Sequence, residues 1–257
     1  MAETMLDRDE PDPVTLDNEA GRSVFFLTCD HAGRAIPRAL DRLGLPDYET
    51  RRHIAWDIGI GGVGRRLSQL LDATVILQTY SRLVIDCNRD PKVPSSIPEI
   101  SETTEIPGNL GLTEAARAAR VNAIFRPYLA TIAAALDRRA AADRASVLVA
   151  LHSFTPVFKG IARPWHAAVL YNRDARLALP LFELLNAEDD LVVGDNEPYR
   201  VTDLTDYTVP VHGEQRGLPY VEIEIRQDQI GEPVGQAAWA ERLARVLPAA
   251  YSEFLRR

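Results

Sequence analysis

Short apolar segments alternate along this chain with stretches of helical periodicity. Segments typical of strands lie at residues 23–29, 75–77, 83–87, 147–151, 166–172 and 220–230. Helical patterns occupy residues 48–72, 113–144, 175–187 and 235–257. Strands that alternate with helices build an open sheet that is covered by helices. We therefore predict an α/β fold with helices on both faces of the sheet.

Residues 21–257 show no repeat, linker or change of composition, so we expect one domain. The acidic start of the chain has no apolar signal core, and we expect a flexible tail over residues 1–20. Thr113 is a candidate N-cap for the helix at 113–144, and Pro127 should kink or divide that helix. Segment 91–111 is rich in Pro, Ser and Glu, and we expect a functional surface loop.

The composition narrows the classes of partner. A net charge of −8 argues against a nucleic acid, which needs a basic surface, but allows a small anionic substrate. No apolar run approaches the ~20 residues of a membrane span. Cys29 and Cys87 are the only cysteines of the chain and favour buried thiols in a reducing compartment. We expect a cytoplasmic monomer or small homo-oligomer that contacts neither nucleic acid nor membrane.

Polar side chains stand at the ends of several apolar segments. They are Asp30 and His31, then Asp86, Asn88 and Arg89, then His152 and Ser153, and finally Glu222 and Glu224. In open α/β sheets the site lies beyond the carboxyl ends of the strands. We therefore expect these groups to meet at one edge of the sheet.

His31 and His152 are candidate metal ligands. Two histidines and a carboxylate with an open fourth position form a catalytic zinc site, which activates water and polarises a carbonyl. Asp57, in AWDIGIGG, is the candidate third ligand. Each residue also has an ordinary explanation. The histidines could bond backbone groups at strand ends, and Asp57 could be a solvated or capping carboxylate.

Glu222 and Glu224 share the polar face of the 220–230 segment. Either could take a proton from water and return it to a leaving amine, although both could be exposed residues of a half-buried strand. Arg89 beside Asn88 suits the capture of a substrate carboxylate, unless Arg89 pairs with Asp86.

Ser153 and His212 are further candidates for substrate contact. His212 could equally be a surface-loop histidine. Ser153 could be the nucleophile of a serine hydrolase, but no G-x-S-x-G elbow surrounds it.

The segments TCDHAGRAIP, YSRLVIDCNRD, IPGN, LHSF and RGLPYVEIEIRQD occur in this order. Together they resemble the N-formylglutamate amidohydrolase family over residues 22–253. The resemblance implies a phosphorylase/hydrolase-like mixed sheet, related to zinc carboxypeptidases, succinylglutamate desuccinylases and aspartoacylases. It also implies hydrolysis of N-formylglutamate to formate and glutamate, with zinc or another divalent transition metal as the cofactor.

The resemblance assigns roles to individual residues. His31 and His152 resemble the first and last metal histidines of the wider superfamily, Asn88 and Arg89 its carboxylate-gripping pair, and Glu224, rather than Glu222, its general base. The relatives use His-x-x-Glu for two ligands, whereas Arg34 occupies the fourth position here. Asp57 is our substitute for the missing carboxylate.

N-formylglutamate carries two carboxylates, so a matched pocket needs a second donor besides Arg89. The candidates, each of which could instead be surface charge, are Arg82, Arg163, Arg200 and Arg216. Lys92 and the 91–111 loop could form a lid. The leading hypothesis is a metal-dependent amide hydrolase of a small anionic N-acyl amino acid. The alternative, favoured by the missing His-x-x-Glu, is a non-catalytic carboxylate-binding protein on the same scaffold.

Overall fold

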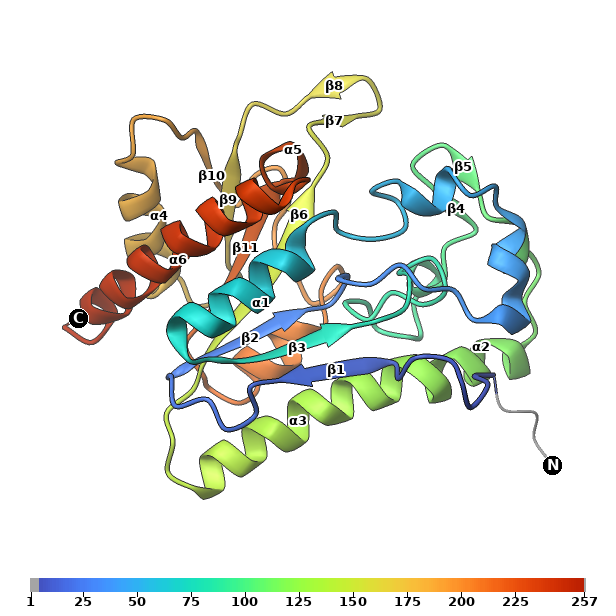
Figure 1. The fold of residues 1–257 in the computed structure, drawn as a ribbon, viewed down its shortest axis with the longest axis horizontal. Coiled ribbons are helices and arrows are strands. Elements are labelled where there is room, and N and C mark those ends of the chain that lie inside the picture. The colour runs from blue at the N-terminus through green and yellow to red at the C-terminus, as the bar shows by residue number, and fades with distance from the viewer. Residues whose placement is uncertain (1–4, 257) are drawn as a thin grey trace.

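A mixed β-sheet runs through the centre of the protein (Figure 1). Within residues 5–256, which the computed structural model describes, the sheet has seven strands in the order β1-β3-β2-β6-β11-β9-β10. Their bounds are β1 Val14–Asp17, β2 Phe25–Cys29, β3 Thr74–Gln78, β6 Val147–Phe154, β9 Ala167–Leu170, β10 Val193–Asp195 and β11 Tyr220–Arg226. The neighbours β3, β2, β6 and β11 are parallel, so their carboxyl ends meet at one edge.

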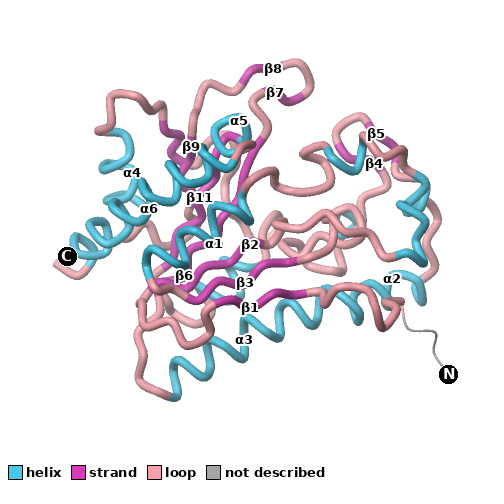
Figure 2. The backbone as a smooth tube through the Cα atoms, viewed as in Figure 1, coloured by secondary structure: helices cyan, strands magenta, loops and turns pink. Residues whose placement is uncertain are grey.

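Helices cover both faces of the sheet, as predicted (Figure 2). They are α1 Ile60–Leu71, α2 Glu114–Arg120, α3 Arg126–Ala141, α4 Ala178–Asn186, α5 Gln227–Ile230 and α6 Pro233–Phe254. Apolar residues of α1, α4 and α6 pack on one face, and those of α3 pack on the other. None of the helices in the described part of the chain is long and apolar enough to cross a membrane.

Alternation along β11 separates a core face from a polar face. Val221, Ile223 and Ile225 join the core beneath α1 and α6, whereas Glu222 and Glu224 point to the opposite side. Glu224 lies level with His152 of the parallel neighbour β6. Both carboxylates are buried, so these two residues are not the exposed side chains that the alternation alone would allow.

Shorter elements surround the carboxyl edge of the sheet. Two hairpins, β4 Ile100–Ser101 with β5 Thr104–Glu105 and β7 Val157–Phe158 with β8 Ile161–Ala162, project from the body of the protein (Figure 1). The first hairpin lies in the 91–111 segment that we expected to be a loop. Short 3-10 segments lie at Arg38–Gly44, Glu49–Arg51, Pro94–Ser96 and Pro107–Asn109, and π-helical segments at Val121–Phe125 and Val209–Glu214.

The predicted flexible tail over residues 1–20 is wrong for part of its length. Val14–Asp17 forms the edge strand β1, which is antiparallel to β3, and the Thr79 N–H donates to the Pro13 carbonyl. The Arg38 guanidinium is paired with Asp7 and Asp9. Residues 1–4 lie outside the described residues.

Two other predictions need correction. Residues 83–87 do not form a strand but a buried turn, and the helix expected from residue 48 begins at Ile60.

The long helix expected at 113–144 is divided, as anticipated, and a π-helical segment over Val121–Phe125 precedes Pro127 at the start of α3. Thr113 caps α2, because its hydroxyl accepts the Ala116 N–H at 3.2 Å.

Candidate active site

A cavity of about 420 Å³ opens at the carboxyl ends of β2, β6 and β11. Sequence-predicted residues that line it are His31, Asp57, Arg82, Asn88, Arg89, His152, Ser153, Glu222 and Glu224. These residues come from five separate stretches of the chain. The parallel strands bring them together because their carboxyl ends share one edge.

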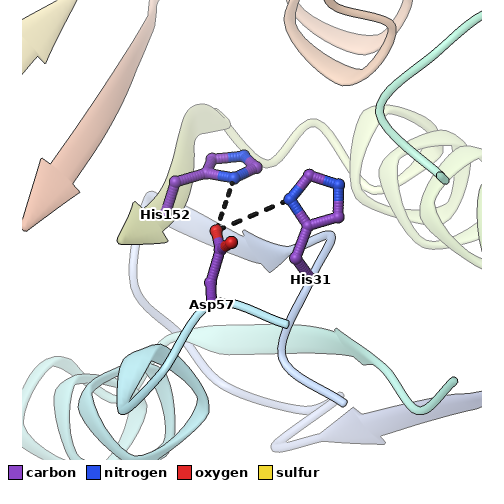
Figure 3. A group of neighbouring side chains, drawn as sticks. All are labelled: His31, Asp57 and His152. Atoms are coloured by element: carbon purple, nitrogen blue, oxygen red, sulfur yellow. Dashed lines mark hydrogen bonds and ion pairs between the residues drawn. The ribbon is translucent and has the colours of Figure 1, made fainter. Parts of the chain in front are cut away.

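His31, Asp57 and His152 form a buried cluster at the floor of the cavity (Figure 3). The distance from Asp57 Oδ2 is 3.1 Å to His152 Nδ1 and 3.5 Å to His31 Nδ1. His31 Nδ1 is buried and makes no hydrogen bond within residues 5–256. The structure thus brings together the three residues predicted as metal ligands.

Backbone contacts explain how Asp57 reaches the two strand ends. The Asp57 N–H donates to the His31 carbonyl at 2.9 Å, and the Ser153 N–H donates to Asp57 Oδ2 at 3.1 Å. Gly33 lets the turn after His31 lie against the end of β3, because an added Cβ would lie only 1.9 Å from the Thr79 carbonyl oxygen.

A separate aspartate orients each imidazole. His31 Nε2 lies 2.7 Å from Asp86 Oδ1, and His152 Nε2 lies 3.2 Å from Asp30 Oδ2. Ionised carboxylates only accept hydrogen bonds, so both Nε2 atoms carry the hydrogen. When the imidazoles are neutral, each Nδ1 atom is then unprotonated and faces Asp57, and this is the tautomer that a metal ligand requires.

The two orienting aspartates have different environments. Asp30 Oδ1 accepts hydrogen bonds from the hydroxyls of Tyr128, at 2.8 Å, and Thr208, at 2.7 Å. Asp86 Oδ2 instead accepts from the Arg82 guanidinium at 2.8 Å. Asp30 is therefore held by neutral donors and Asp86 by a cation.

The charged groups of the cluster shift one another's pKa values toward the ionised forms. Burial alone would raise the pKa of Asp57, but His31 and His152 reverse this effect and lower it. Burial lowers the pKa of His152, but the charges and hydrogen bonds of Glu222, Asp30 and Asp57 raise it well above its usual value. Such a strongly anionic pocket favours a bound cation, whether a proton or a metal ion.

The cluster fits a divalent metal ion. Ligand atoms that share a tetrahedral ion at 2.0–2.2 Å lie roughly 3.3–3.6 Å from one another. The two distances to Asp57 Oδ2 are 3.1 and 3.5 Å, and all three ligand atoms lie within 4.8 Å of one another. The donor set of two imidazoles and one carboxylate is one that zinc accepts in catalytic sites.

Glu224 and Glu222 border this cluster within the cavity. Burial, aided by the Asp57 charge and opposed by His152, raises the pKa of Glu224 to about 7. Burial and the Asp206 charge raise the pKa of Glu222 well above its usual value. One oxygen of each carboxyl, Glu224 Oε2 and Glu222 Oε2, has no hydrogen-bond partner in the described chain. Each can therefore accept or donate a proton in the cavity.

The predicted carboxylate-binding pair divides into two roles. The Arg89 side chain is less engaged than that of Asn88, because its nearest carboxylate oxygen in the described chain, Asp86 Oδ2, lies 4.0 Å from Arg89 Nε. The Asn88 side chain is engaged with the loop opposite: its oxygen accepts the N–H groups of Tyr207 and Thr208, each at 2.9 Å, and its nitrogen donates to Asp206. Asn88 thus fixes a wall of the cavity.

Of the two further candidates for substrate contact, Ser153 lines the cavity and His212 does not. The Ser153 hydroxyl donates to the Ile58 carbonyl at 3.0 Å, which leaves it poorly placed as a nucleophile. His212 is buried in the Val209–Glu214 segment and does not line the cavity. Burial and the Arg216 charge lower the pKa of His212 to about 4.

Sequence reasoning missed several lining residues. They include His53, Glu102, Tyr199 and Asp206. His53 lies in no recognisable motif, and Tyr199 and Asp206 lie in a stretch with no periodic pattern. The only indication of Tyr199 and Asp206 in the sequence is that the segment around them is rich in polar residues.

Comparison with known proteins agrees with this site. The family model for N-formylglutamate amidohydrolase matches residues 23–231. The chain belongs to the N-formylglutamate amidohydrolase family. The resemblance seen in the sequence motifs is thereby confirmed.

Solved structures share the fold of this chain. The gene product Atu2144 from Agrobacterium tumefaciens is 38% identical, with a TM-score of 0.94 over 96% of this chain and 98% of that chain. An N-formylglutamate amidohydrolase from Ralstonia eutropha JMP134 shares the fold at 19% identity, with a TM-score of 0.68 over 94% and 98% of the two chains. No curated protein matches the chain.

Proposed function

We propose that this protein is a metal-dependent amidohydrolase that removes the N-formyl group, or a related N-acyl group, from glutamate or a similar acidic amino acid. Membership of the amidohydrolase family gives the reaction class. The observation that carries the proposal is the cluster of His31, Asp57 and His152 beside the partnerless Glu224 carboxyl in one cavity.

The cluster residues would hold zinc or another divalent transition metal. When bound, such an ion would supply Lewis-acid polarisation of the acyl carbonyl and of an attacking water. Asp30 and Asp86 keep the two imidazoles in the required tautomer.

Glu224 is the proposed general base. Its pKa of about 7 suits a group that takes a proton from water and returns it to the leaving nitrogen at neutral pH. Glu222, with its strongly raised pKa, is the proposed second proton-bearing group of the site. Arg89 would bind a substrate carboxylate, because no carboxylate of the described chain lies closer than 4.0 Å to it.

The cellular setting and partners are part of the proposal. Cys29 and Cys87 are buried free thiols, which supports a reducing, cytoplasmic location. We propose a monomer or small homo-oligomer whose partner is a small anionic N-acyl amino acid rather than a nucleic acid or a membrane.

The reason for the binding-protein alternative was the missing His-x-x-Glu pattern. The short distances from the Asp57 carboxylate to both imidazoles support a ligand set without that pattern, and so support the hydrolase over this alternative.

A substrate series tests the proposed reaction. Metal-loaded protein would be given the N-formyl, N-acetyl and N-succinyl derivatives of glutamate, and release of free glutamate would be measured. We expect turnover with at least one derivative, and faster turnover than with the matching derivative of alanine, which lacks the second carboxylate. Binding of these compounds without any release of glutamate would instead establish the carboxylate-binding alternative.

A further inference from the structure

Two arginines face the cavity without a close carboxylate partner. Arg89 is one of them, and Arg200 is the other: its only hydrogen bond within residues 5–256 is made by its backbone carbonyl. Free guanidinium groups in a cavity are suited to substrate carboxylates.

The other arginines considered for a second carboxylate are already engaged. Arg82 pairs with both Asp57 and Asp86, at 3.3 and 2.8 Å. Arg216 pairs with Asp137 at 2.6 Å and does not line the cavity. Arg163 is buried behind the cavity wall, where its guanidinium lies over three aromatic rings. This leaves Arg200.

Tyr199, beside Arg200, offers a hydroxyl proton to the same cavity. Arg163 Nη1 donates to the Tyr199 hydroxyl oxygen at 2.7 Å, and the guanidinium carbon lies 4.7 Å from the centre of the tyrosine ring. Arginine has no acceptor, so the tyrosine proton must point elsewhere. No acceptor for it is found within residues 5–256.

The loop that carries this pair is anchored at both ends. The Asn196 side chain accepts the Tyr171 N–H at 3.0 Å, and Asp206 accepts from the Asn88 side chain at 3.1 Å. These contacts fix the ends of the loop, and Arg163 holds the Tyr199 hydroxyl, before any ligand binds, which lowers the entropic cost of binding.

We propose that the Tyr199 hydroxyl and the Arg200 guanidinium form a second carboxylate subsite, which binds the side-chain carboxylate of an N-acyl dicarboxylic amino acid while Arg89 binds the other carboxylate. Arg163 is a positioning residue, because it acts through Tyr199. The inference rests on the proposed function and deepens it, because it assigns selection of the acidic side chain to specific residues.

The test compares two substrates that differ only in one charge. N-formylglutamate carries the side-chain carboxylate, and N-formylglutamine replaces it with a neutral amide. We expect Arg200→Met and Tyr199→Phe each to lower kcat/KM for N-formylglutamate about 10- to 100-fold, with little change for N-formylglutamine. Arg22→Met and Tyr48→Phe, at exposed positions outside the cavity, serve as matched controls.

An unchanged preference for N-formylglutamate in both variants would overturn the subsite while leaving the proposed function intact. If the wild-type protein hydrolyses neither compound, the N-formyl group is not its substrate, and calorimetry with glutarate and butyrate decides the subsite independently of the reaction. Loss of the preference for glutarate in Arg200→Met would support the subsite. The same relative affinity in wild type and variant, or no binding to either, would refute it.

Discussion

Glu224 owes its chemical character to its position on β11. The strand places Glu224 level with His152. Burial, together with the nearby Asp57 charge, raises the pKa of Glu224 to about 7. A glutamate of the same sequence context on an exposed strand would be an ordinary acid. The alternation of residues 220–230 could be predicted from the sequence, but not the burial of its polar face.

Replacing Glu224 with Gln tests the role of its carboxyl. Glutamine keeps the shape of the side chain but cannot take a proton, so we expect turnover to fall by roughly 10²–10⁴ while metal content is unchanged. Normal turnover in Glu224→Gln, with Glu222→Gln as the comparison, would move the role to another group.

The pH dependence of the wild-type rate belongs with this residue. A general base works when ionised, so kcat/KM should rise with pH through the pKa of Glu224. Burial raises the pKa of Glu224 to about 7, and a divalent ion at the cluster favours the carboxylate, so we expect the midpoint at or below about 7. This acidic limb should disappear in the Glu224→Gln variant. An identical limb in that variant would assign it to a different group.

Tyr128 acts on the cluster through Asp30. Its hydroxyl donates to Asp30, which in turn orients His152. We expect Tyr128→Phe to weaken metal affinity about 10-fold, as is usual for partners of a ligating histidine. Competition with a chelator measures the Kd, and Tyr80→Phe, which removes a buried hydroxyl that donates to Pro11, is the control. An unchanged Kd in Tyr128→Phe would show that its hydroxyl serves packing alone.

At the level of elements, the turn at 82–89 shows where sequence reasoning stopped. Leu83, Val84 and Ile85 are fully buried, which is why their apolar run predicts a strand. Side chains rather than a neighbouring strand satisfy the backbone there: Asn109 donates to the Leu83 carbonyl and Arg120 to the Val84 carbonyl. An apolar run indicates burial but does not say which groups bond the backbone.

Arg120 and Asn109 together form a clamp on the turn at 82–89, and Asn109 belongs to the IPGN motif at residues 106–109. Arg120 is 2% exposed, and its guanidinium donates to Gly108 and Asn109 as well as to Val84. Burial lowers the pKa of Arg120 to about 10, so the side chain remains charged at neutral pH. The motif thus supports the turn that carries Arg82 and Arg89 and does not itself line the cavity.

Removal of the clamp should affect both stability and substrate binding. Arg120→Met leaves several buried acceptors without a partner, and we expect the free energy of unfolding to fall by about 3 kcal/mol. KM should rise, because the turn that bears Arg89 loses its support. Denaturant unfolding and steady-state kinetics measure these effects, with Arg117→Met on the same helix as control. Wild-type stability together with wild-type KM would contradict the role of the clamp.

On the scale of the whole molecule, the sequence was sufficient for the architecture and for much of the site. Strand–helix alternation predicted a covered sheet, and the rule of carboxyl ends brought together residues that lie far apart in the chain. Asp57 was the least supported ligand, because a single aspartate before a glycine-rich helix has no distinctive pattern. Only the folded chain shows its carboxylate between the two imidazoles (Figure 3).

The edge strand β1 illustrates a second limit at this scale. Residues 14–17 are only half-buried, and their pairing with β3 depends on a partner about 60 residues away in the chain. Composition alone assigned them to a loose tail. Tertiary pairing of short, weakly apolar segments is the information that the sequence pattern lacked.

The central claim is that His31, Asp57 and His152 hold one metal ion on which amide cleavage depends. Elemental analysis of gently purified protein, combined with formate release from N-formylglutamate before and after chelation, tests this claim most directly. The account predicts one divalent transition metal per chain, loss of that metal in His152→Ala, and formate release that chelation abolishes and metal restores. Full formate release from metal-free protein, or unchanged metal content in His152→Ala, would contradict it.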